Sequence, residues 1–259
     1  MEDARREILT QVAAGTLTPS EAASRLEEVE RGQTQARVDP LTSHAAAEIR
    51  GVRIRSDYGR IIVVGDPSVA EAIAEGPHLA RHEDGILVIE SDQDFDGDFW
   101  FGQRGGGHWW NRLGGPAVTV RMNPRLETWV SADAGTVTVR DILAPIHAEV
   151  QAGSLVIQAF AGPLDLAASA GSIRAEGRLK EGSSRIRCEI GSVRIALAPD
   201  SDVRVSVLAN MGTVNLDAGT DTIGGARRWG ERQEAVFGTG AASLDIESQM
   251  GSVTVSRSQ

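Results

Sequence analysis

A short phrase recurs along the second half of the chain: Gly, then Ser or Thr, an aliphatic residue, a variable residue, and a further aliphatic residue or Ala. It begins at Gly135, Gly153, Gly171, Gly191, Gly212 and Gly251. These glycines follow one another after 18, 18, 20, 21 and 39 residues. Self-similarity at a step near twenty residues indicates a repeat architecture, in which each unit buries its apolar face only against its neighbours.

Between the phrases, a second set of aliphatic residues alternates with polar ones. The sets are Ile146/Ala148/Val150, Leu164/Leu166/Ala168, Ile186/Cys188/Ile190 and Val203/Val205/Val207. Each repeat therefore supplies two short strands with one apolar face each. Glycine can adopt a positive φ at the corner between the two strands. The sequence predicts a mainly β fold, a β-solenoid of parallel strands, with Cys188 in its core.

Two irregularities appear in this pattern. The interval of 39 residues is close to two steps, so we expect one turn of the solenoid to lack its phrase, with a loop insertion over residues 218–233. Near the start of the β region, Gly51 interrupts an alternating run, which favours a β-bulge.

The first 30 residues have helical spacing, with Leu9, Val12 and Leu26 among the apolar positions. Thr18-Pro19-Ser20-Glu21 resembles a capping box at the start of a second helix. We expect an α-helical hairpin over 1–30, a polar linker over 31–46 and the solenoid over 47–259. Helices this short are marginal alone, so the hairpin needs a partner: the rest of the chain, another copy, or another protein.

The composition restricts the functions open to the chain. Lys and Arg number 26 against 36 Asp and Glu, a net charge of −10, which argues against nucleic acid as a partner. A single Cys excludes a disulfide framework. No apolar run is long enough to span a bilayer directly, and no secretory signal is visible, so the predicted location is cytoplasmic.

Two segments resemble metal sites. Asp92, Asp94, Asp96 and Asp98 have the spacing of a calcium loop, but Gln103 stands where a bidentate Glu is expected. His78 and His82 are four residues apart, in a segment bracketed by glycines that favours a turn. The sequence favours a solvated acidic turn over a calcium site, and it predicts no other metal and no cofactor.

Catalytic motifs are absent from the sequence: there is no Gly-x-Ser-x-Gly elbow and no phosphate-binding loop. Polar residues alternate with the predicted core and are expected on the solvated side of the strands: Asp165, Arg174, Arg185, Arg187, Arg194 and Arg204. We therefore predict no enzymatic activity, with a carbohydrate-active enzyme on a β-helix as the alternative.

Six of the aromatic residues gather between Phe95 and Trp110, interrupted by Gly102, Gly105, Gly106 and Gly107. Such a segment either packs back to cap the solenoid, as solenoid ends require, or contacts a partner. The partner-contact candidates here are Phe99, Trp100, Phe101, Trp109 and Trp110, and in the hairpin they are Leu9, Val12 and Leu26.

Residues 48–256 resemble the putative-adhesin, or toastrack, β-strand-repeat family of bacteria. The likeness rests on the repeated glycine phrases and on the ending from Gly238 to Val255. Residues 8–26 resemble the short SHOCT-like helical module that often precedes toastrack domains. The family often has Asp after the corner glycine, where this chain has Ser or Thr.

The resemblance implies a non-enzymatic scaffold or protein-interaction protein, linked to bacterial envelope-stress signalling. Its partners would be proteins, among them membrane-associated stress-signalling components. The hairpin would then serve self-association, giving a homo-oligomer, or partner docking. A self-polymerising structural solenoid is a further alternative, because uncapped solenoids can stack end to end.

Overall fold

The computed structural model describes residues 49–91, 117–217, 222–223, 230 and 232–258, and residues Glu48–Gln259 form one compact unit. All regular elements of the described residues are strands. They are β1 (Gly51–Gly65), β2 (Ala72–Glu75), β3 (His78–Glu83), β4 (Ile86–Ser91), β5 (Ala117–Met122), β6 (Glu127–Arg140), β7 (Ile146–Phe160), β8 (Leu164–Gly177), β9 (Ser183–Leu197), β10 (Val203–Asp217), β11 (Thr222–Ile223), β12 (Arg232–Phe237) and β13 (Ala242–Arg257).

The predicted hairpin over 1–30 and linker over 31–46 lie outside the described residues, so both stay predictions. No helix in the part of the chain that the structure describes could cross a membrane.

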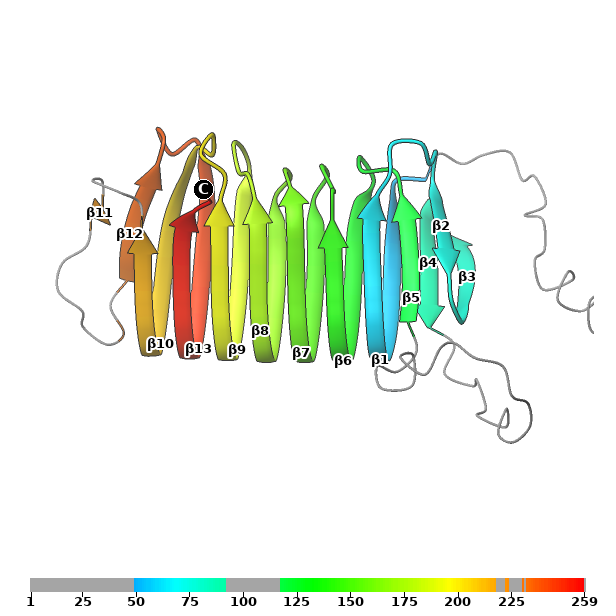
Figure 1. The fold of residues 1–259 in the computed structure, drawn as a ribbon, viewed down its shortest axis with the longest axis horizontal. Helices are drawn as coiled ribbons and strands as arrows, with labels where there is room; N and C mark the ends of the chain where they lie inside the picture. The colour runs from blue at the N-terminus through cyan, green and yellow to red at the C-terminus, as the bar shows by residue number, and fades with distance from the viewer. Residues whose placement is uncertain (1–48, 92–116, 218–221, 224–229, 231, 259) are drawn as a thin grey trace, which may run out of the picture. The chain divides into compact units, whose positions relative to one another are not determined.

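Seven strands of 14 to 16 residues are bent at a glycine near the middle, so that each has a first and a second arm. The glycines have φ between 115° and 150°: Gly59, Gly135, Gly153, Gly171, Gly191, Gly212 and Gly251. In Figure 1 the arms form two layers that join along the lower edge, with the connecting loops along the upper edge. Each bent strand is one rung of a flattened two-layer solenoid.

The rungs are parallel and pair glycine on glycine, in the order β10-β13-β9-β8-β7-β6-β1. A Cβ atom on Gly171 would collide with the carbonyl oxygen of Gly153 on the neighbouring rung, and the same relation repeats along the row. Only glycine fits both the positive φ and this close approach. The predicted β-solenoid with glycine corners is confirmed.

The C-terminal strand departs from the order of the sequence. β13 pairs with β9 on one side and with β10 on the other, and Figure 1 shows it between them. The expectation that one turn lacks its phrase is therefore wrong. The 39-residue interval from Gly212 to Gly251 contains a strand, β12, that runs antiparallel to β10, after which the chain returns to insert β13.

At the other end, one rung is shared by two strands. β4 pairs with the first arm of β1 and β5 pairs with the second arm, both in parallel. Antiparallel strands follow as the outermost elements: β3 beside β4, and β2 beside β5. The corner glycine has no equivalent here among the described residues, because residues 92–116 join β4 to β5 and lie outside the described part.

The core lies between the two layers and consists of inward side chains stacked in columns. One column contains Ala148, Leu166, Ile186, Ile246 and Val207, all 4% exposed or less. Cys188 is also buried, as predicted, and desolvation raises the pKa of its thiol.

The alternation predicted that Ile190 shares the core face with Ile186 and Cys188, and this prediction is wrong. The side chain of Ile190 is 56% exposed, because the two residues before each corner glycine both turn outward.

Candidate functional site

Most site residues that the sequence singles out cannot be placed. The five aromatic candidates from Phe99 to Trp110, the hairpin positions Leu9, Val12 and Leu26, and the calcium candidate Asp92 to Asp98 all lie outside the described residues.

The turn predicted for His78 and His82 is wrong, because both residues lie in strand β3. Four residues along a strand separate their Cα atoms by about 13 Å, too far for one metal ion. Within the described ranges, no group of three or more His, Cys, Asp or Glu side chains could hold a metal.

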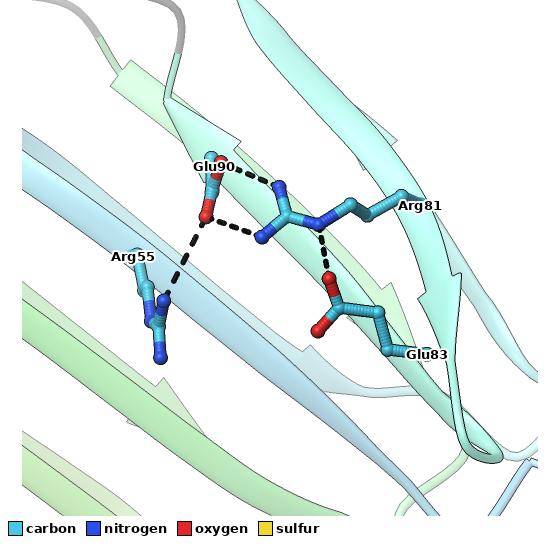
Figure 2. A network of polar contacts seen from close by, with 4 residues as sticks. All are labelled: Arg55, Arg81, Glu83 and Glu90. Carbon is cyan, nitrogen blue, oxygen red and sulfur yellow. Dashed lines mark hydrogen bonds and ion pairs between the residues drawn. The ribbon is translucent and has the colours of Figure 1, made fainter.

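A network of charged side chains joins β3 to its neighbours at this end. The Arg81 guanidinium donates to Glu90 at 2.6 and 2.9 Å and to Glu83, while Arg55 lies 3.8 Å from Glu90 (Figure 2). The bond from Arg81 holds the pKa of Glu90 below its ordinary value. Charged side chains on an outermost strand oppose the addition of further strands.

The outward residues predicted from the alternation are exposed, as expected. Asp165, Arg185, Arg187 and Arg204 lie on the first arms, whereas Arg174 and Arg194 lie on the second arms. The two groups thus belong to opposite faces of the solenoid.

A row of outward side chains crosses five adjacent rungs on the first-arm face: Arg53, Trp129, His147, Asp165 and Arg187. We call this row the Trp129 platform. Arg53, Trp129, His147 and Asp165 are direct cross-strand partners on β1, β6, β7 and β8. Arg187 lies on β9, two residues beyond Arg185, which is the direct partner of Asp165. The indole of Trp129 stacks on the His147 ring, with centroids 5.7 Å apart and planes 11° apart, and the Arg53 guanidinium lies 5.7 Å from the indole centroid.

Gly51 gives the indole its position. A side chain there would collide with the Trp129 ring, and the pairing of Gly51 with Glu127 and Ile86 continues without a shift in register. The predicted bulge is therefore wrong: Gly51 is required for space over the sheet.

The imidazole of His147 is held on both sides. Its Nε2 lies 2.9 Å from Glu127 Oε1, and its Nδ1 lies 3.8 Å from Asp165 Oδ2. Arg187 then lies 3.7 Å from the other Asp165 oxygen. These side chains are 37% to 53% exposed, so the chain of contacts fixes orientation more than it adds stability.

A shallow groove of ≈ 230 Å³ runs along this platform and also contacts Arg55, Ser131 and Glu149. It combines an aromatic surface with three guanidinium groups and two carboxylates. Such a groove can stack an apolar group and pair with charges of either sign, but it encloses little volume.

Trp129 and His147 are not among the predicted site residues, although the repeat contains a signal for them. Trp129, His147 and Asp165 stand 18 residues apart, which is the repeat step itself, so equal positions in successive repeats should lie side by side. Trp129 also alternates with inward Thr128 and Val130, which places it outward.

No protein-family model matches the chain, and no curated protein is similar to it. Among solved structures, a "putative cell adhesion protein" from Clostridium sporogenes is 12% identical, over 81% of this chain and 94% of that chain, with a TM-score of 0.44. A "putative adhesin" from Bacteroides fragilis is 12% identical, over 80% of this chain and 92% of that one, with a TM-score of 0.36. The fold assignment rests on the strand register described above.

Proposed function

We propose that this protein is a non-enzymatic interaction scaffold that binds a protein partner through the Trp129 platform. The observation that carries the proposal is an outward tryptophan between Arg53 and His147 on a regular face of the solenoid. Tryptophan and arginine are the residue types that supply much of the binding energy in protein interfaces. The core does not use this indole, since the core lies on the other side of β6.

The platform is also built rigidly, which favours binding. Its side chains stand on in-register strands, Gly51 makes room for the indole, and Glu127 and Asp165 orient His147. A preformed surface loses little conformational entropy when a partner docks. We expect the partner to bring an aromatic or aliphatic side chain to the indole edge and a carboxylate to Arg53.

The identity of the partner is proposed from the sequence resemblance alone. The resemblance supports a partner from a bacterial envelope-stress system, including its membrane-associated components. We also propose a cytoplasmic location for this chain. The resemblance also supports a SHOCT-like hairpin over 1–30 that docks the partner or a second copy. Replacing Leu9 and Leu26 by Asp tests the hairpin: unchanged oligomeric state and unchanged partner capture would refute its role.

Capture of partners from the native host with tagged full-length protein tests the platform. Trp129→Ala should lose a partner that the wild type retains, while Arg194→Ala, on the opposite face, should retain it. Thermal unfolding of both variants checks that the fold is intact. Equal capture by Trp129→Ala and wild type would refute the platform as the binding site.

One observation favours the alternative of a carbohydrate-active enzyme. The groove contains two carboxylates, Glu149 and Asp165, together with arginines, as polysaccharide-cleaving β-helices require. Against it, Asp165 faces Arg187 and His147, and both carboxylates belong to a shallow, open surface. Release of new sugar ends from a panel of polysaccharides, abolished in Asp165→Asn, would replace the scaffold proposal with this one.

The self-polymerising alternative requires end-to-end strand addition. At one end of the sheet, the outermost strand β3 carries Arg81 and Glu83, and Arg81 also pairs with Glu90 on β4. Strand β3 runs antiparallel to β4. Both features oppose stacking in register. Filaments seen by electron microscopy in the wild type would favour polymerisation, and their absence at high concentration would exclude it.

A further inference from the structure

An exposed apolar row runs along the bent edge of the solenoid, beside the glycines. The residue before each corner glycine is apolar in all seven bent strands, and the strand pairing places these residues next to one another. In spatial order they are Tyr58, Ala134, Ala152, Ala170, Ile190, Met250 and Met211. We call this row the apolar ridge.

The large members of the ridge are far more exposed than the core aliphatics. Tyr58, Ile190, Met250 and Met211 are 47%, 56%, 47% and 49% exposed, and the three alanines are exposed too. At about 4.8 Å per rung, the ridge is ~29 Å long. A contiguous apolar strip of this kind on a regular edge indicates an interaction surface.

From this ridge we propose that two copies of the chain associate edge to edge, antiparallel, with β8 on the two-fold axis. The proposal concerns a different surface from the Trp129 platform and does not depend on it. A two-fold axis through β8, perpendicular to the ridge, brings β1 opposite β10, β6 opposite β13 and β7 opposite β9.

The side chains along the ridge are complementary under this operation. Large side chains of one copy face small side chains of the other: Met250 faces Ala134, and Ile190 faces Ala152. Tyr58 meets Met211, a favourable aromatic–sulfur pair. Ala170 meets its own copy at the axis. A parallel arrangement would instead place methionine on methionine and leave gaps between the alanines.

The polar residues on one side of the ridge are complementary as well. This row, one residue earlier in each strand, contains Asp57, Asp133, Gln151, Ser169, Glu189, Gln249 and Asn210. The two-fold operation places this row against the same row of the second copy. Asp57 then faces Asn210, Asp133 faces Gln249, and Glu189 faces Gln151. Each acidic residue thus meets an amide, and no two like charges face each other.

The amides can make these bonds in addition to those within the chain. Gln151 Nε2 donates to Asp133 at 2.8 Å, and Asn210 Nδ2 donates to Gln249 at 2.5 Å. An amide nitrogen carries two N–H donors, so one remains on each. Charge and shape complementarity of one edge with itself is what an isologous interface requires.

The area buried between the two copies sets the expected affinity of the dimer. A strip ~29 Å long and about 15 Å wide covers roughly 450 Å² per copy, or about 900 Å² in total, at the low end for specific interfaces. We therefore expect a reversible dimer that forms with increasing protein concentration.

Cysteine cross-linking of the full-length protein tests the geometry. Ala170→Cys places two thiols at the axis, and mild oxidation should give a covalent dimer on non-reducing electrophoresis. Ala134→Cys is the matched control: its two copies would lie about four rungs, or ~19 Å, apart, beyond the reach of a disulfide. Native Cys188 is 2% exposed and does not compete.

Two outcomes decide the proposal. Dimer from Ala170→Cys and from a mixture of Ala134→Cys with Met250→Cys, but not from Ala134→Cys alone, would support it. Equal cross-linking of Ala170→Cys and Ala134→Cys, or of neither, would overturn it.

By sedimentation equilibrium, Met250→Asp should raise the dimer dissociation constant about tenfold or more, since a carboxylate would face Ala134 in an apolar contact. An unchanged constant would also overturn the proposal.

Discussion

The glycine row permits a quantitative prediction for Gly171→Ala. Gly171 has φ of 150°, and a Cβ there would collide with the carbonyl oxygen of Gly153. A non-glycine residue in such a conformation costs about 1–3 kcal/mol. Relief of a steric clash in a packed structure costs about 1–3 kcal/mol more. We expect the free energy of unfolding to fall by about 4 kcal/mol in total.

Gly230→Ala is the matched control, because Gly230 also has a positive φ, 75°, but no atom of the described residues lies within 4 Å of the place that a Cβ atom would take. It should cost only about 1 kcal/mol. For a domain of this size, 1 kcal/mol lowers the Tm by roughly 2–4 °C, so the expected losses are about 8–16 °C for Gly171→Ala and about 2–4 °C for Gly230→Ala. Thermal unfolding followed by far-UV circular dichroism measures both. Equal losses in the two variants would refute the claim that close packing of the rungs requires glycine.

Three further predictions follow from single residues. Asp202 accepts hydrogen bonds from the Thr239 hydroxyl and from the backbone amides of residues 239–241, and these bonds hold the pKa of its carboxyl below the ordinary value. The stability that the ionised carboxylate adds is present above the unfolded pKa of about 3.9. It is lost as the pH falls through the lower pKa of the folded state. Asp202→Asn should therefore lower the Tm at pH 7, and the difference from wild type should shrink below pH 4; a gap that is constant with pH would contradict this. The Ser248 hydroxyl is buried without a hydrogen-bond partner among the described residues, so Ser248→Ala should leave the Tm unchanged or raise it, by up to about 1 kcal/mol of stability in denaturant titration; a marked loss would show that the hydroxyl has a partner. Trp129→Ala should lower the Tm by less than about 4 °C, because the indole is half-buried on the outer face of β6 and takes no part in the core between the layers. A larger drop in calorimetry would assign the indole to stability instead of binding.

The repeat step let the sequence predict the solenoid, its glycine corners and most of its core. It did so because each rung presents the same few constraints: a positive φ, a close approach to the next rung and two inward arms. Gly59 belongs to the same row, but Arg60 follows it in place of Ser or Thr, so the phrase did not include it. The conformation of the corner thus depends on the glycine and less on the hydroxyl.

The order of the rungs could not be predicted, because every rung has nearly the same pattern. Nothing local to β13 indicates that it pairs with both β9 and β10; the antiparallel β12 and the Asp202 contacts to the turn before β13 determine that return. The exposure of Ile190 was missed for a related reason, since simple alternation fails at a corner where two consecutive residues face outward.

The candidate surfaces required the register between rungs. Trp129, His147 and Asp165 are ordinary residues singly and become a platform only when a step of 18 residues places them side by side. The apolar ridge is similar: one alanine or methionine before a glycine carries no signal, whereas seven adjacent apolar residues form a surface.

We propose above that the first-arm face around Trp129 contacts a protein partner in the cell. A photo-cross-linking amino acid at Ser131, an exposed neighbour of Trp129 on β6, tests it directly, with Thr138 on the opposite face of the same strand as the control. We expect a specific covalent adduct with a second protein from position 131 and none from position 138, under illumination of the native host. Adducts of equal yield from both positions, or none from position 131, would contradict it.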